Sequence, residues 1–112
     1  MTEEVEFTQL APDFYVAGQL DVSDIERLIL LGINTLVCNR PDGEADQTSS
    51  KIISAAAEAA NIKFVYLPMT NPDDTATQCV EFKEVLADSG VVLAYCRTGR
   101  RSSALWQSTI KA

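Results

Sequence analysis

The sequence predicts an α/β fold in which a mostly parallel central sheet is flanked by helices. Three observations lead to this class. Short runs rich in β-branched and aromatic residues alternate with helical stretches, as in parallel-sheet proteins. The length of 112 residues suits one domain, which we expect to cover residues 1–112. The hydrophobic fraction of 46% is enough for one core without disulfides or metals.

The first elements follow from local signals. Two short strands, at residues 7–10 and 14–17, flank a Pro-Asp turn. Ser23 and Glu26 have the spacing of a capping box, and we expect the helix that they begin to end at the next glycine. Residues 35–38 are rich in apolar side chains and carry no charge, which predicts a buried strand.

The second half of the chain continues the alternation. The alanine-rich stretch 48–60 predicts a helix, and the strand at 63–67 ends at a proline. A helix at 75–88 follows a group of candidate capping residues. Residues 91–95 form the most hydrophobic run, so we expect them to be the central strand. The last helix is predicted at 101–111.

Composition excludes several classes of function. Nine basic and sixteen acidic residues give a net charge of −7, which disfavours nucleic-acid binding and adhesion to anionic membranes. The absence of histidine excludes Ser-His-Asp triads, Cys-His dyads and histidine-based zinc sites. We find no metal-ligand or cofactor motif, and therefore expect no cofactor.

The cysteines and the N-terminus bear on the compartment. Three cysteines without a Cys-x-x-Cys pair are not a disulfide framework and fit a reducing environment. Residues 1–9 are acidic and lack the apolar core of a signal peptide, and no apolar run is long enough to span a membrane. We therefore expect a cytoplasmic protein.

The informative segment joins the predicted central strand to the last helix. Cys96 ends the strand, and the loop Arg97, Thr98, Gly99, Arg100, Arg101, Ser102 follows. A loop between a strand and a helix N-terminus directs backbone N–H groups inward, so it binds anions. Three arginines in five positions add positive charge that can grip an anion. A cysteine at the mouth of this loop should have a lowered pKa.

Four segments carry a resemblance to a known family. Cys-x-x-Gly-x-Arg-Ser resembles the active loop of cysteine-dependent tyrosine and dual-specificity phosphatases. Together with Ala17-Gly18-Gln19-Leu20, Asn39-Arg40-Pro41-Asp42-Gly43-Glu44 and Leu67-Pro68-Met69, it looks like the bacterial phosphatase-like domain of beta-lactamase-hydrolase-like proteins. The resemblance covers nearly the whole chain. It implies a cysteine-dependent phosphatase-like fold with the site beyond the carboxyl end of a central strand.

The chain departs from the tyrosine phosphatase pattern in two places. Cys96 and Arg101 have four residues between them, one fewer than in that pattern, and Tyr95 stands where those phosphatases usually carry histidine. The shorter spacing resembles the active loop of rhodanese-type sulfurtransferases, which suits a persulfide sulfur. Members of the matching family also occur beside sulfide-oxidising domains.

Three functions are therefore considered, and the first is a phosphatase. The Cys96 thiolate would attack phosphorus while Arg101 and the loop N–H groups bind the oxygens. A carboxyl must protonate the leaving oxygen, since histidine is absent. The resemblance makes Asp73 or Asp74 the best candidate for this acid, although helix N-capping is the favoured role for both, and Asp42 is the second choice.

The alternatives use the same loop. A sulfurtransferase would carry a persulfide on Cys96 and needs no general acid. A non-catalytic anion-binding module would leave the pKa of Cys96 near its usual value. In each case the expected partner is a small anionic or phosphorylated ligand, and an apolar patch on the last helix could support a homodimer.

Besides the loop itself, Arg40, Asp42 and Tyr95 are expected to support the site, and Ser102 has a role of its own. The Ser102 hydroxyl could hydrogen-bond Cys96 and help the thiolate leave. Arg40 should pair with Asp42, with Glu44 or with carbonyl groups near the site, and a direct substrate contact is the less favoured reading. Tyr95 is expected in the core or in the pocket wall.

Overall fold

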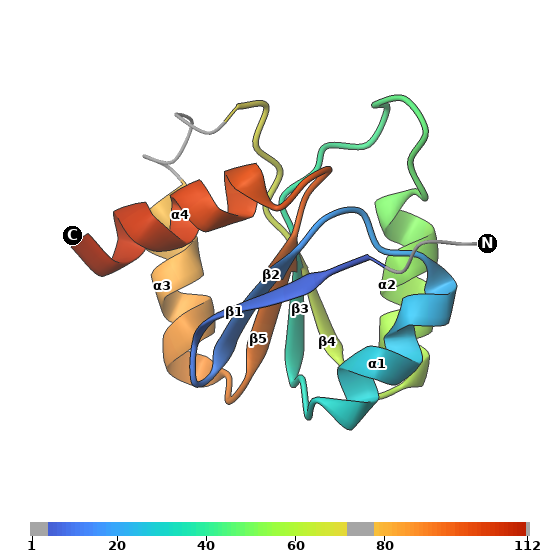
Figure 1. Cartoon of the computed structure of the whole chain (residues 1–112), viewed down its shortest axis with the longest axis horizontal. Helices are drawn as coiled ribbons and strands as arrows, with labels where there is room; N and C mark the ends of the chain where they lie inside the picture. The colour runs from blue at the N-terminus through green and yellow to red at the C-terminus, as the bar shows by residue number, and fades with distance from the viewer. Residues whose placement is uncertain (1–4, 72–77, 112) are drawn as a thin grey trace.

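The computed structural model describes residues 5–71 and 78–111 and contains a five-stranded sheet with helices on both faces (Figure 1). The strands are β1 (Phe7–Ala11), β2 (Phe14–Ala17), β3 (Thr35–Cys38), β4 (Lys63–Tyr66) and β5 (Val92–Tyr95). The helices are the 3₁₀ turn η1 (Val22–Asp24), α1 (Ile25–Leu30), α2 (Ser50–Ala59), α3 (Gln78–Asp88) and α4 (Arg100–Lys111). The predicted α/β class is confirmed.

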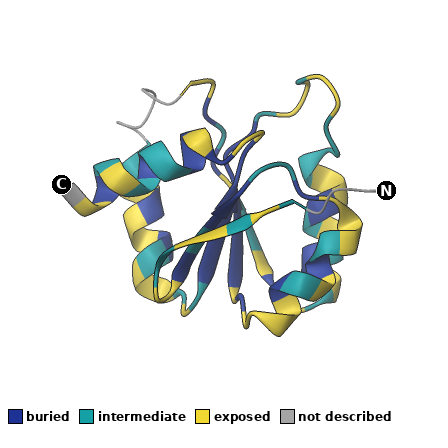
Figure 2. Ribbon diagram, in the orientation of Figure 1, coloured by how far each residue is buried: buried dark blue, intermediate teal, exposed yellow. Residues whose placement is uncertain are grey.

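The sheet has the order β1-β2-β5-β3-β4. β1 pairs antiparallel with β2, and every other pair is parallel. β5 lies in the middle, and all four of its residues are buried (Figure 2). The prediction that the most hydrophobic run is the central strand is therefore confirmed.

Each face of the sheet has its own apolar cluster (Figures 1 and 2). Helices α1 and α2 cover one face with Ile25, Leu28, Ile53 and Ala57. Helices α3 and α4 cover the other face with Phe82, Val85 and Leu105. Because both faces are covered, the central strands are hydrophobic throughout rather than alternating.

The parallel strands bring distant loops together. The carboxyl ends of β5, β3 and β4 lie at the same end of the sheet, so the segments 96–99, 39–49 and 67–71 leave from the same side (Figure 1). In open α/β sheets this is where ligands bind.

Two predicted details of the helix starts differ from the structure. The capping box is formed by Asp21 and Asp24 around η1, not by Ser23 and Glu26, because the Asp21 carboxylate already accepts the first free N–H groups. The N-cap of α2 is Ser49, so this helix begins after residue 48. No helix within the described ranges has the length and hydrophobicity to span a membrane.

Candidate active site

The loop after β5 wraps its backbone around the sulfur of Cys96. The Gly99 N–H donates to Sγ over 3.1 Å. The backbone N–H groups of Thr98, Arg101 and Ser102 also act on this sulfur and lower its pKa. Gly99 has φ +91°, a left-handed conformation that glycine adopts without strain. Four of the six predicted loop residues, Thr98, Gly99, Arg101 and Ser102, therefore direct their backbone toward one sulfur atom.

The electrostatic result is a stabilised thiolate. Burial alone would raise the pKa of Cys96, but the four backbone N–H groups outweigh burial, and the pKa is lowered from 9.0. The prediction that Cys96 sits at the mouth of the loop is wrong. Only 1% of the residue is exposed, which places Cys96 at the floor of the loop.

The segment after β2 supports this loop from behind. The Cys96 N–H donates to the Ala17 carbonyl over 3.3 Å, and the Gln19 N–H donates to the Arg97 carbonyl over 3.1 Å. A Cβ atom at Gly18 would lie 2.9 Å from that same Arg97 oxygen. Glycine at this position lets the two backbones approach, which explains the Ala-Gly-Gln segment noted in the sequence.

Arg101 is clamped beside the sulfur by a carboxylate from another loop. Its Nη1 and Nη2 atoms donate to the two Glu44 oxygens over 2.8 and 2.9 Å, and Nη1 also donates to the Met69 carbonyl over 2.7 Å. Glu44 raises the pKa of Arg101, as does the Cys96 sulfur. Hydrogen bonds from Arg101 are the main reason that the pKa of Glu44 is lowered from 4.5 to about 2, so Glu44 stays ionised.

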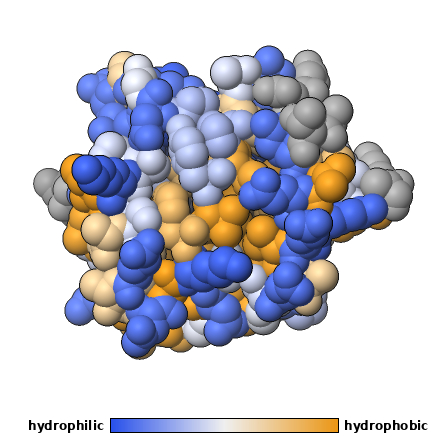
Figure 3. Space-filling model, turned by 180° about the vertical axis from the view of Figure 1, so that it is seen from behind, coloured by the Kyte–Doolittle hydropathy of each residue, from blue (hydrophilic) through white to orange (hydrophobic). Residues whose placement is uncertain are grey.

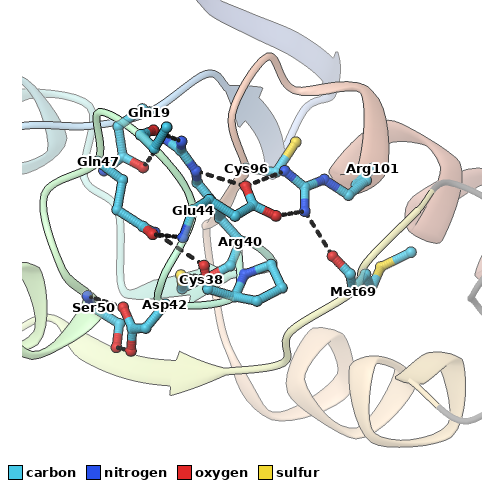
Figure 4. Close-up of polar contacts among 12 residues, drawn as sticks. Gln19, Cys38, Arg40, Asp42, Glu44, Gln47, Ser50, Met69, Cys96 and Arg101 are labelled. Carbon is cyan, nitrogen blue, oxygen red and sulfur yellow. Dashed lines mark hydrogen bonds and ion pairs between the residues drawn. The ribbon is translucent and has the colours of Figure 1, made fainter.

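Arg40 completes the clamp from the side of the Glu44 carboxylate opposite to Arg101 (Figure 4). It is only 2% exposed, and its Nε donates to Glu44 over 2.9 Å. Its other nitrogens donate to Gln19 Oε1 over 2.9 Å and to the Ala45 carbonyl over 2.6 Å. The expected pairing of Arg40 with Glu44 and a nearby carbonyl is therefore confirmed, whereas its role toward a substrate stays a prediction.

The Ser102 hydroxyl has a different partner from the one expected. It donates to Asn39 Oδ1 over 2.9 Å, and Asn39 in turn donates to the Leu67 carbonyl over 2.8 Å. Ser102 reaches Cys96 through its backbone N–H instead. This hydroxyl therefore ties the first turn of α4 to the ends of β3 and β4.

Asp42, the acidic candidate within the described residues, is engaged away from the sulfur. It accepts the Ser50 N–H over 2.8 Å and the Ser50 hydroxyl at the start of α2. Asp73 and Asp74 lie outside the described residues. Tyr95 is buried at the end of β5, where burial raises the pKa of its hydroxyl and keeps it neutral. Tyr95 therefore belongs to the core.

A cavity of about 480 Å³ opens above the loop. Arg97 and Arg100 are exposed there and form no ion pair with any residue in 5–71 or 78–111. The cavity is lined by Arg40, Glu44, Ala45, Thr70, Asn71, Arg97, Thr98, Arg100 and Arg101. Four guanidinium groups face one carboxylate, so the cavity attracts anions although the chain is acidic. The described residues contain no group of three side chains suited to a metal ion.

The family model of the beta-lactamase hydrolase-like protein, phosphatase-like domain, matches residues 6–111. The chain belongs to this family. The beta-lactamase hydrolase-like protein of Agrobacterium fabrum is 30% identical over 93 residues, which cover 81% of this chain and 22% of that protein. This member therefore spans about a fifth of the length of that relative.

Solved structures of similar fold are consistent with membership of this family. A candidate phosphatase from Neisseria meningitidis is 36% identical, with a TM-score of 0.80 over 88% of this chain and 72% of that one. Two more distant structures share the fold. A candidate phosphatase from Shewanella putrefaciens is 19% identical, with a TM-score of 0.81 over 92% of this chain and 66% of that one. PTPMT1 is 13% identical, with a TM-score of 0.69 over 94% of this chain and 71% of that one. The predicted resemblance and the phosphatase-like fold are confirmed.

Two contacts were not foreseen from the sequence. The Asn-Arg-Pro-Asp-Gly-Glu segment suggested that Glu44 could pair with Arg40, but not that it also holds Arg101. The hydrogen bond between Asn39 and Ser102 was also missed. A signal was present, since residues that follow neighbouring parallel strands meet at one sheet edge.

Proposed function

We propose that this phosphatase-like domain is a cysteine-dependent phosphatase that acts on a small anionic phosphoester through Cys96. One observation carries the proposal: four backbone N–H groups and the Arg101 guanidinium converge on a single sulfur with a lowered pKa. A thiolate surrounded by donors can attack an electrophile that carries negatively charged oxygens.

The reaction has two displacements at phosphorus. In the first, an S–P bond to Cys96 forms while the ester P–O bond breaks, and the leaving oxygen takes a proton from a general acid. In the second, water attacks phosphorus and gives its proton to the carboxylate that the general acid became in the first step, while the S–P bond breaks and Cys96 leaves as thiolate. Arg101 and the loop N–H groups bind the equatorial oxygens in both steps, most strongly at the transition state.

The general acid is proposed to be Asp73, with Asp74 as its alternative. Glu44 is unsuited to this role, because its pKa of about 2 and its bonds to two arginines leave it without a proton. Asp42 is occupied by the Ser50 N–H at the start of α2. Asp73 and Asp74 follow the strand β4, whose carboxyl end lies at the site edge of the sheet.

The test is turnover of an aryl phosphate by the purified chain. We expect activity in the wild type and none in Cys96→Ser. Asp73→Asn should slow release of a poor leaving group more than that of a good one, and the same effect in Asp74→Asn instead would make Asp74 the general acid. If wild type and Cys96→Ser hydrolyse the substrate equally, the proposal is wrong.

A second candidate, a sulfurtransferase, is favoured by one observation. Among the residues that the structure describes, no protonated carboxyl faces the cavity, and persulfide transfer needs none. The Cys96 thiolate would attack the sulfane sulfur of thiosulfate, forming an S–S bond as sulfite leaves. The loop N–H groups would then stabilise the persulfide.

Mass spectrometry separates the two reactions. After incubation with thiosulfate, a sulfurtransferase gains the mass of one sulfur atom on Cys96, and the Cys96→Ser protein does not. A phosphatase instead shows a phosphorylated Cys96 when it is quenched during aryl phosphate turnover. A protein that does neither would contradict both candidates.

A further inference from the structure

The outer edge of β4 is open within the described part of the chain, since the sheet ends there. On the β3 side, the Lys63 N–H donates to the Asn34 carbonyl over 3.0 Å and the Leu67 N–H to the Cys38 carbonyl over 2.8 Å. Alternate residues of a strand bond to the same neighbour, so Val65 also bonds toward β3. The backbone N–H and C=O groups of Phe64 and Tyr66 therefore point outward.

A groove runs beside this edge, between β4 and α3. It has a volume of about 540 Å³ and is lined by Lys63, Val65, Val80, Glu81, Glu84, Val85 and Asp88. Val80 is 64% exposed, which is unusual for a valine on a helix beside a sheet. Seen from behind, hydrophobic residues gather in the middle of the molecule between hydrophilic ones (Figure 3).

The edge and the groove suit the same ligand. Lys63 and Val65 turn their side chains to the α3 face, whereas Phe64 packs on the opposite face. A strand added outside β4 would bond to Phe64 and Tyr66 and would place every second side chain in the groove. An isolated backbone edge would bind any strand, but the groove adds side-chain selectivity.

The charge of the groove selects the occupant. Three carboxylates, on Glu81, Glu84 and Asp88, face one lysine, Lys63. A second copy of this chain would bring the same acidic set against it, and like charges in contact are unfavourable. A basic segment would instead neutralise the excess, and apolar side chains between the basic ones would cover Val65 and Val80.

We propose that β4 and α3 form a docking site for an extended segment of a partner protein. This segment adds a sixth strand to the sheet and directs alternating basic and apolar side chains into the groove. The docking site lies on a different edge of the sheet from the Cys96 loop, so binding does not depend on the reaction at Cys96.

Amide exchange tests the backbone part of the proposal. The probe is a synthetic peptide, blocked at both ends, with the central sequence Lys-Thr-Val-Thr-Lys. In the free protein the Phe64 and Tyr66 amides should exchange quickly and the Val65 amide slowly. Saturating peptide should slow Phe64 and Tyr66 by roughly tenfold or more and leave Val65 unchanged. No change at Phe64 and Tyr66 would overturn the proposal.

Peptide variants test the strand pairing itself. Methylating the threonine nitrogens removes the bonding N–H groups of an antiparallel strand, and methylating the valine nitrogen removes that of a parallel one. One of the two peptides should bind at least about tenfold more weakly, measured by fluorescence anisotropy. If both bind like the parent peptide, no strand is added and the proposal is wrong.

Matched protein variants test the charge. Glu84→Gln should weaken peptide binding by about two- to fivefold at low salt. Glu26→Gln removes the same charge from an exposed position on α1, and its binding should equal that of the wild type. Equal loss in both variants would contradict a specific site. A dimer that protects Phe64 and Tyr66 without peptide would show that a second copy is the occupant, which also overturns the proposal.

Discussion

Replacing Glu44 by glutamine should loosen the clamp that holds Arg101 beside Cys96. The carboxylate accepts one hydrogen bond from Arg40 and two from Arg101, all between 2.8 and 2.9 Å. Glutamine keeps one carbonyl oxygen but turns an NH₂ group toward a guanidinium, so at least one of these bonds becomes a contact between two donors. The variant therefore removes an interaction and adds a repulsion without changing side-chain size.

The magnitude follows from the pKa of Glu44 and from burial. A fall in pKa from 4.5 to about 2 corresponds to roughly 3 kcal/mol at about 1.4 kcal/mol per unit. Because 32% of the Glu44 side chain is exposed, solvent screening reduces this to about 1–2 kcal/mol. Arg40, which is 2% exposed, also loses a partner, so we expect a total loss of about 2–3 kcal/mol. Under the proposed function, a misplaced Arg101 should also lower kcat/KM by roughly a hundredfold.

The assay is urea unfolding of the wild type, Glu44→Gln and the exposed control Glu26→Gln at several pH values. The folded-state pKa of Glu44 is depressed, so its contribution is fully present above about pH 4.5 and is lost as the pH falls toward 2. The gap between wild type and Glu44→Gln should therefore be constant from neutral pH to about 5 and then close. A gap that is absent at neutral pH, or that persists unchanged in acid, would refute this account of the clamp.

Three further predictions concern the loop. The ultraviolet absorbance of the Cys96 thiolate is measured as the difference between wild type and Cys96→Ser. Its titration midpoint should lie below the pKa of about 8.5 of a free thiol, and a midpoint at or above that value would contradict the lowered pKa of Cys96. Gly99→Ala and Gly32→Ala, at φ +91° and +73°, should each destabilise the fold by about 1–2 kcal/mol, but only Gly99→Ala should raise the pKa of Cys96. Arg97→Gln and Arg100→Gln should each weaken phosphate binding about three- to tenfold in low-salt calorimetry, with unfolding free energies within about 0.5 kcal/mol of wild type; unchanged affinity in both would mean that neither arginine serves the anion.

The elements that the sequence predicted well are those that depend on contiguous residues. The run from β5 through the Cys96 loop into α4 carries its own signals: an uncharged hydrophobic strand, a glycine at a left-handed position and a helix start. A loop of this kind turns its N–H groups inward whatever surrounds it, so its anion-binding character could be inferred without the rest of the fold.

The missed features depend on how strands align. Glu44 and Arg101 are 57 positions apart, and Asn39 and Ser102 are 63 apart. They meet only because β3 and β5 pair in parallel with Cys38 opposite Tyr95, which places the residues after both strands side by side. The depth of Cys96 was missed for a similar reason, since the loop closes against the segment after β2.

The charges of the site fit both candidate reactions, so the choice between them rests on the source of a proton. Four guanidinium groups and the Glu44 carboxylate leave a net positive charge around the cavity. A phosphate monoester and thiosulfate are both dianions near neutral pH, so either would balance this excess. Only the phosphoester needs a protonated carboxyl as its leaving group departs, and no described residue at the cavity supplies one. Asp73→Asn therefore has opposite consequences: it should impair a phosphatase and leave persulfide formation on Cys96 unchanged.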